Sequence, residues 1–82
     1  MVTESRLQCT RIAEERAYEI AECIGARLTK ATADGTMHQG FDMWFKVRTD
    51  HAAYTTELLG QTFPFIVIEP HEGSLNIMIP AS

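Results

Sequence analysis

The side chains that could ligate a metal or transfer a proton are few in this sequence of 82 residues. The histidines and cysteines are His38, His51, His71, Cys9 and Cys23. None of them stands at the C-x-x-C or H-x₃-H spacing that is typical of zinc sites. The sequence therefore predicts no metal site and no cofactor.

Asp50, His51 and Tyr54 could in principle form an acid–base set, but close neighbours in a short helix seldom converge on one substrate. A chain of this length also rarely encloses a pocket without oligomerisation. We therefore expect no catalytic residue and no enzyme. The alternative is an oligomeric small enzyme or ligand-binding protein that uses His51, Tyr54 or His71 in an intersubunit pocket.

A strand with two different faces is predicted over residues 41–48. One face carries Phe41, Met43, Phe45 and Val47, and the other carries Asp42, Trp44, Lys46 and Arg48. An aromatic ring beside two cations could stack a base and hold phosphates, as in proteins that bind single strands. The formal net charge of −4 opposes this use, and Trp is also a favoured anchor at protein interfaces. Direct binding of nucleic acid is therefore not expected.

The last part of the chain places apolar residues on both faces of a predicted hairpin. One set should meet the helices: Ile66, Ile68, Leu75, Ile77 and Ile79. Phe65, Val67 and Met78 should then point away from them, on the same outer face as Trp44. Exposed apolar surface of this kind is typical of a protein interface. We expect a protein partner or a two-fold homodimer on this face, and the alternative is that the chain itself shields these residues.

The first helix carries an acidic stripe. Glu15, Glu19 and Glu22 follow one another at i, i+4 and i+7. Like charges one turn apart do not stabilise a helix. The stripe is therefore a candidate for docking on a basic surface, and the alternative is a solvated helix face.

The elements that should position these residues begin with a helix over residues 5–25. Ser5 and Gln8 fit a capping box at its start, and Gly25 fits the position that follows a helix. Residues 26–33 then show the short alternation of a strand and end at Asp34-Gly35, a strong hairpin signal. Pairing across this turn would set Leu28 opposite Phe41 and Ala26 opposite Met43.

The second half of the chain should repeat this order. Thr49 or Asp50 can cap a helix that runs through Leu59 and ends at Gly60, with Pro64 preventing its resumption. Strands over 65–69 and 74–79 follow, joined by a turn over 70–73. Their predicted register sets Ile68 opposite Leu75 and Ile66 opposite Ile77.

We therefore predict a single α+β domain over residues 1–82, in the order αββαββ. The expected architecture is a two-layer sandwich, in which a four-stranded antiparallel sheet carries both helices on one face.

Localisation follows from the cysteines and the hydropathy pattern. Cys9 and Cys23 lie 14 residues apart in one helical pattern, about 21 Å along a helix, so they cannot form a disulfide bond within the chain. Reduced thiols indicate a cytoplasmic protein. No secretory signal and no run of about 20 apolar residues is present, so we expect no membrane association.

The distribution of charge along the sequence also bears on the expected function. Residues 49–82 contain four acidic residues and no Lys or Arg, so the whole net charge lies there. We expect a small non-enzymatic binding protein that acts as an inhibitor or adaptor on another macromolecule. In size and acidity alone the chain is similar to small phage or mobile-element proteins, such as anti-CRISPR proteins, and equally to bacterial adaptors and immunity proteins.

Overall fold

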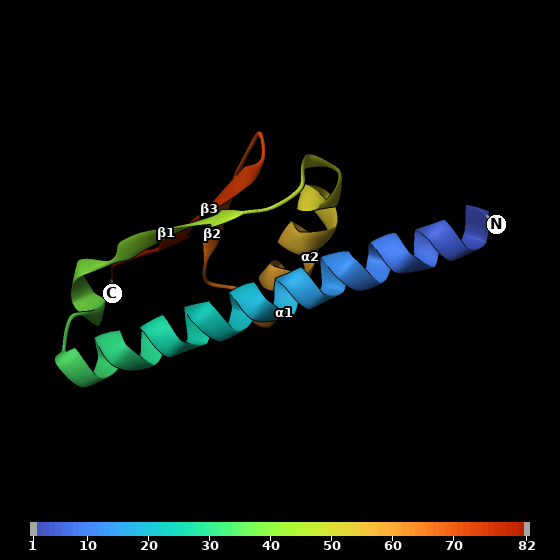
Figure 1. The fold of residues 1–82 in the computed structure, drawn as a ribbon. Helices are drawn as coiled ribbons and strands as arrows, with labels where there is room; N and C mark the ends of the chain where they lie inside the picture. Colours follow the sequence, from blue (N-terminus) through green and yellow to red (C-terminus); the bar gives the residue numbers. More distant parts are fainter. Residues whose placement is uncertain (1, 82) are drawn as a thin grey trace.

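The computed structural model describes the backbone of residues 2–81 and the side chains of residues 11–81. Two main helices, two 3₁₀ turns and three strands follow one another along the chain. They are α1 (Val2–Asp34), η1 (Met37–Gln39), β1 (Phe41–Lys46), η2 (Thr49–His51), α2 (Ala52–Thr62), β2 (Val67–His71) and β3 (Ser74–Ile79). The strands form one antiparallel sheet in the order β1-β3-β2. Figure 1 shows this sheet lying over α1.

The first helix is longer than predicted. It continues through Gly25 to Asp34, so the expected strand over residues 26–33 is wrong. Glycine inside a helix costs about 1 kcal/mol relative to alanine, which neighbouring contacts can outweigh. Ala31 is fully buried and Leu28 packs against the core, so tertiary packing favours the helix over this segment.

The helix ends at Asp34-Gly35, which does not form a hairpin turn. Gly35 has a φ of 71°. Its N–H donates to the Thr32 carbonyl at 3.2 Å, and the Thr36 N–H donates to the Ala31 carbonyl at 2.9 Å. These two bonds form a Schellman motif, which closes a helix through a left-handed residue.

The sheet consequently has three strands instead of four, and the order αββαββ is wrong for the described residues. The predicted pairs of Leu28 with Phe41 and of Ala26 with Met43 do not form, because residues 26–34 are helical. β1 pairs with β3 instead, with Phe41 opposite Ile79 and Met43 opposite Ile77. The predicted alternation of β1 is confirmed, since Asp42, Trp44 and Lys46 are exposed and the residues between them are half-buried.

The second helix also begins and ends differently from the prediction. The 3₁₀ turn η2 precedes α2, and no side-chain hydrogen bond caps either element, so the predicted caps at Thr49 and Asp50 are wrong. Gly60 lies inside α2, which ends two residues later at Thr62. Pro64 follows closely, and the residue before a proline avoids helical backbone.

The C-terminal hairpin forms with a register two residues away from the predicted one. Ile68 lies opposite Ile77, and Pro70 lies opposite Leu75. A shift of two residues leaves each side chain within the paired strands on its predicted face, but Phe65 and Ile66 precede β2. The turn consists of Glu72 and Gly73, and Gly73 has a φ of 76°.

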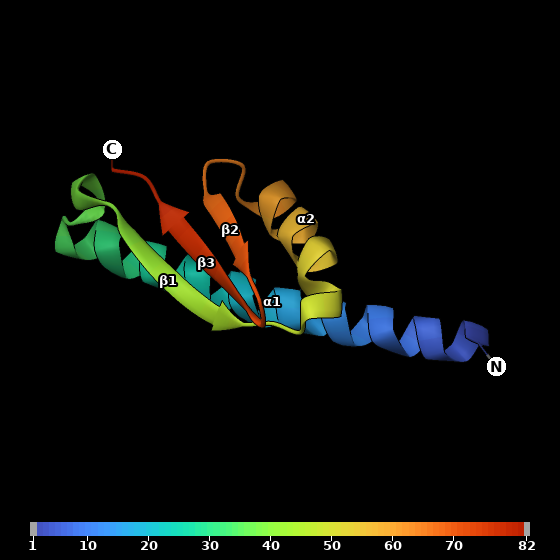
Figure 2. The ribbon, with the colours of Figure 1, turned by 90° about the horizontal axis from the view of Figure 1, so that it is seen from above.

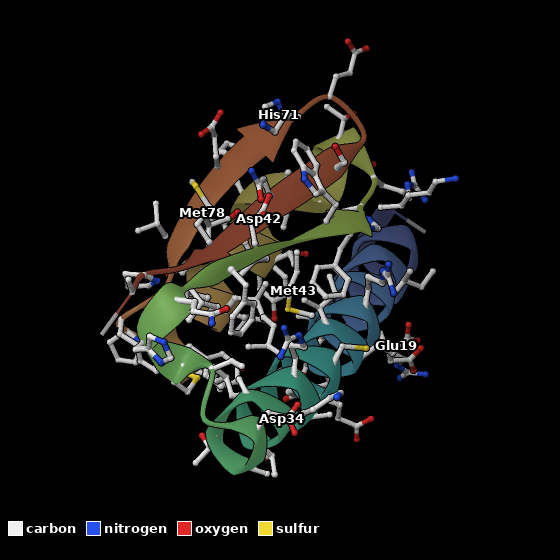
Figure 3. All side chains as sticks on the ribbon, turned by 90° about the vertical axis from the view of Figure 1, so that its left-hand side faces the viewer. Glu19, Asp34, Asp42, Met43, His71 and Met78 are labelled. Carbon is white, nitrogen blue, oxygen red and sulfur yellow. The ribbon has the colours of Figure 1, made fainter. Side chains whose placement is uncertain are left out.

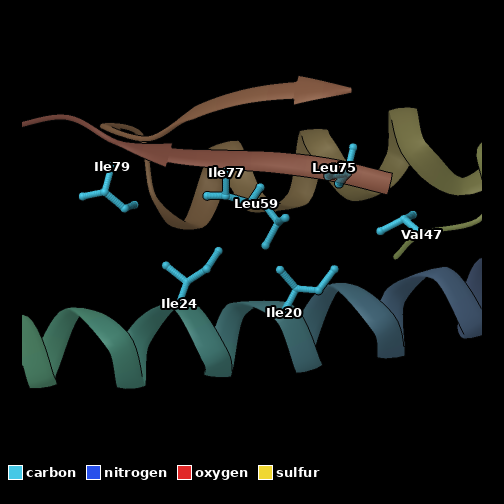
Figure 4. Close-up of a cluster of buried hydrophobic side chains, with 7 residues drawn as sticks. All are labelled: Ile20, Ile24, Val47, Leu59, Leu75, Ile77 and Ile79. Carbon is cyan, nitrogen blue, oxygen red and sulfur yellow. The ribbon is translucent and has the colours of Figure 1, made fainter. Parts of the chain in front are cut away.

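A compact apolar core joins α1, α2 and the inner face of the sheet (Figure 4). Its buried members are Ile20, Ile24, Val47, Leu59, Leu75, Ile77 and Ile79. Ala13 and Ala17 are buried on α1, and α1 packs against α2. Figure 2 shows α2 beside β2 at one edge of the sheet.

The first helix sets the length of the molecule. Its 33 residues span about 50 Å at 1.5 Å per residue, and the longest dimension of the chain is 51 Å. Figures 1 and 2 show the N-terminal turns of α1 extending beyond the sheet and α2. None of the helices in the described part of the chain is both long and apolar enough to cross a membrane.

Candidate functional site

The face of the sheet turned away from α1 carries nine residues in three cross-strand rows, and we call it the outer face. The rows are Asp42–Met78–Val67, Trp44–Asn76–Glu69 and Lys46–Ser74–His71. Figure 3 shows Asp42, Met78 and His71 on this side, whereas Met43 points between the sheet and α1. The strand pairing therefore determines which side chains are neighbours on the outer face.

Three of the four residues predicted to form an interface lie together on the outer face. Val67 is directly opposite Met78, and Met78 is a diagonal neighbour of Trp44. Trp44 is 56% exposed and Val67 is 52% exposed. The fourth residue, Phe65, precedes β2 and is exposed, and its ring meets the Phe63 ring edge-to-face with the centroids 6.1 Å apart. Phe65 therefore lies outside the three paired rows.

His71 extends this surface and was not among the residues predicted for it. Its ring lies 4.9 Å from the Trp44 ring, centroid to centroid, at an interplanar angle of 41°. Its Nε2 is 3.3 Å from Oε1 of Glu69. Since residues 67, 69 and 71 share one face of a strand, a longer predicted strand would have revealed the position of His71.

Asn76 lies at the centre of the outer face, between Trp44 and Glu69. Its Oδ1 is buried and has no hydrogen-bond partner among the described residues. A buried polar atom without a partner costs about 1–3 kcal/mol. No local pattern in the sequence singles out Asn76, because it gains its neighbours Trp44 and Glu69 only when β3 pairs with both other strands.

The acidic stripe lies on α1, away from the outer face. Glu15, Glu19 and Glu22 are all exposed, and Figure 3 shows Glu19 beside the helix, away from Met78 and His71. Glu19 accepts a hydrogen bond of 3.0 Å from Arg16. The same guanidinium donates to the Lys46 carbonyl at 3.1 and 2.9 Å, so Glu19 belongs to a contact that joins α1 to the end of β1.

A second acidic residue of α1 also has a local partner. The Tyr18 hydroxyl donates to Oε1 of Glu14 at 2.8 Å. This hydrogen bond and the charge of Glu14 raise the pKa of Tyr18 above its ordinary value. The Glu14 carboxylate therefore has its hydrogen-bond partner within α1.

His51 and Asp50, which were considered for acid–base chemistry, lie in different environments. His51 is buried, and its Nε2 has no hydrogen-bond partner among the described residues. Asp50 is exposed and accepts hydrogen bonds of 3.1 and 2.9 Å from Arg48. Partial desolvation raises the pKa of Asp50, but the hydrogen bonds and charge of Arg48 outweigh it and hold that pKa below its ordinary value. The hydrogen bonding of Asp50 thus ties it to Arg48 rather than to His51.

The cysteines and the other metal-ligating residue types are scattered. Among the side chains of residues 11–81, no three from His, Cys, Asp and Glu gather where they could hold a metal ion. The Cys23 thiol is free and exposed. Cys9 lies in the same helix, but its side chain lies outside the described ones.

Comparisons of the chain with known protein families, curated proteins and solved structures found no match.

Proposed function

We propose that this chain is a non-enzymatic binding protein that acts as an inhibitor or adaptor by placing the outer face of its sheet on a protein partner. One observation carries the proposal: Trp44, Val67 and Met78 all lie on the face opposite α1, where Trp44 and Val67 are more than half exposed. Large aromatic side chains at the centre of such surfaces dominate binding energy in protein complexes.

The rigidity of the sheet supports the same proposal. Leu75 and Ile77 of the central strand are fully buried on its inner face, packed against Ile20 and Ile24 of α1. A face held by such a core loses little conformational entropy on binding, and this preorganisation favours affinity.

Charge supports a basic partner. The chain has a formal net charge of −4, and residues 49–82 contain no Lys or Arg. Glu15 and Glu22 form no ion pair with any described side chain, so they could help to steer a basic partner toward the molecule. The proposal assumes a reducing, cytoplasmic setting, in which Cys9 and Cys23 remain thiols.

The test is capture of a partner by the full chain and two charge variants. Val67→Glu places a carboxylate on the outer face, and we expect binding to weaken by about tenfold or more. Ala33→Glu adds the same charge at an exposed position near the end of α1 and should bind as the wild type does. Capture from a lysate followed by titration of the purified partner gives the affinities.

Equal affinity of Val67→Glu and the wild type would remove the outer face as the binding surface. A small metabolite that copurifies and raises the melting temperature, with no protein partner recovered, would favour a ligand-binding protein or enzyme with an intersubunit pocket instead.

A further inference from the structure

The middle row of the outer face brings together three groups that suit one ligand chemistry. Trp44 of β1 lies opposite Asn76 of β3, and Asn76 lies opposite Glu69 of β2. With neighbouring strands about 4.8 Å apart, the three side chains span roughly 10 Å. The row thus presents an aromatic face, a neutral oxygen acceptor and a carboxylate side by side.

These are the groups that recognise a guanidinium. Arginine carries a planar cation with five N–H donors and no acceptor. It stacks on aromatic rings, of which Trp is the best, and it binds carboxylates through two parallel hydrogen bonds. A lysine ammonium has no planar surface to stack and no fork of donors.

Of these three groups, Asn76 has an acceptor without a donor, whereas Trp44 and Glu69 each contact His71 and remain more than half exposed. Oδ1 of Asn76 is buried without a donor, and Trp44 is 56% exposed. The side chain of Glu69 is 57% exposed, and its ion pair among the described residues is with His71. Lys46 lies in the next row, and no ion pair links it to Glu69 among these residues.

We propose that the row Trp44–Asn76–Glu69 binds an arginine side chain of the protein partner. This inference rests on the proposed function and assigns the chemistry of its central contact. The guanidinium stacks on the Trp44 ring, binds the Glu69 carboxylate and donates a hydrogen bond to Oδ1 of Asn76. Binding requires the His71 ring to move, because it contacts both Trp44 and Glu69.

The test uses the full chain and N-acetyl-arginine amide as the probe, observed by NMR. Trp44 is the single tryptophan of the chain, so its indole N–H resonance reports the site directly, and the Asn76 side-chain amide gives a second resonance. We expect both resonances to shift in a saturable manner. The citrulline analogue has the same shape without the charge and should bind at least about threefold more weakly.

Two matched variants separate a site from general charge attraction. Glu69→Gln removes the carboxylate of the row and should weaken binding of the arginine probe by about three- to fivefold. Glu72→Gln removes the same charge in the adjacent turn, outside the row, and should leave the affinity unchanged. Both positions are exposed, so neither substitution disturbs the core.

Equal affinities for the arginine and citrulline probes, or an unchanged affinity in Glu69→Gln, would overturn the arginine site. If the arginine site fails while Val67→Glu still weakens binding of the partner, the proposed function stands without this contact. If the probe binds as expected but capture is insensitive to Val67→Glu, the site survives and the proposed function fails.

Discussion

Two buried polar residues each have a side-chain atom without a hydrogen-bond partner among the described residues. They are His51 at the end of η2, through Nε2, and Thr55 of α2, through Oγ1. Thr56 Oγ1 is also buried without a partner, although Thr56 as a whole is half-buried. His51 and Thr55 stand four positions apart, so they occupy one helix face, with Leu59 of the core one turn further on. A buried hydroxyl that makes no hydrogen bond lowers stability by about 1–3 kcal/mol.

We therefore expect Thr55→Val to stabilise the protein by about 1 kcal/mol, because valine has nearly the same shape and carries no hydroxyl. Urea unfolding of the two proteins measures the difference. Thr62→Val is the control, because Thr62 is exposed and its hydroxyl donates to the Leu58 carbonyl at 3.0 Å. We expect this substitution to change the free energy of unfolding of the protein by less than about 0.5 kcal/mol. A clear loss of stability in Thr55→Val would show that the hydroxyl is bonded in solution.

At the scale of elements, the decisive feature is the continuity of α1 through Gly25. An added Cβ at Gly25 would meet nothing within 4 Å outside its own helix. At Gly40, which has a φ of 69°, a Cβ would lie 2.9 Å from both the Ile79 carbonyl oxygen and the Ala81 nitrogen. A Cβ atom therefore fits at Gly25 but clashes with the backbone at Gly40.

Gly25→Ala should stabilise the protein by about 0.5–1 kcal/mol, because alanine loses less backbone entropy in a helix. Gly40→Ala should destabilise it by about 1–3 kcal/mol, since it combines an unfavourable φ with a steric clash. Thermal or urea unfolding of both variants provides the comparison. A destabilised Gly25→Ala would mean that α1 ends at this glycine, as the sequence pattern predicted.

At the scale of the whole molecule, the size of the outer face limits what it can bind. Three strands of about six residues cover roughly 14 by 20 Å, or about 300 Å². Stable protein complexes bury about 800 Å² on each partner. A partner must therefore reach beyond the sheet, and a homodimer that uses only this face would be weak.

The two-fold homodimer expected from the sequence stays a prediction. The area of the outer face limits the affinity of such a dimer. We expect sedimentation to show a monomer at about 10 μM, with association only at much higher concentration. Val67→Glu should remove that association, and Ala33→Glu should not. A tight dimer at micromolar concentration would contradict the estimate and indicate that surfaces beyond the sheet take part.

The sequence alone determined those elements whose apolar pattern has one clear period. The alternation of residues 41–46 identified β1 and the outward position of Trp44. The residues within the paired strands of the hairpin likewise lie on their predicted faces, although the register is two residues away and Phe65 lies outside the strands. The class of fold and the exposure of Trp44 and Val67 followed from this local information, because face and period depend only on neighbouring residues.

The tertiary structure decided the features that depend on residues distant in the sequence. Residues 26–34 contain good helix formers, namely alanine, leucine, arginine and lysine, whereas their short alternation favours a strand, so the two local signals disagreed. The burial of Ala31 and the packing of Leu28 decided in favour of the helix. Non-local pairing of β1 with β3 then placed Asn76 beside Trp44, and His71 reached the same ring from β2. A single sequence could not predict this cluster, because its members are neighbours only through the order of strands in the folded sheet.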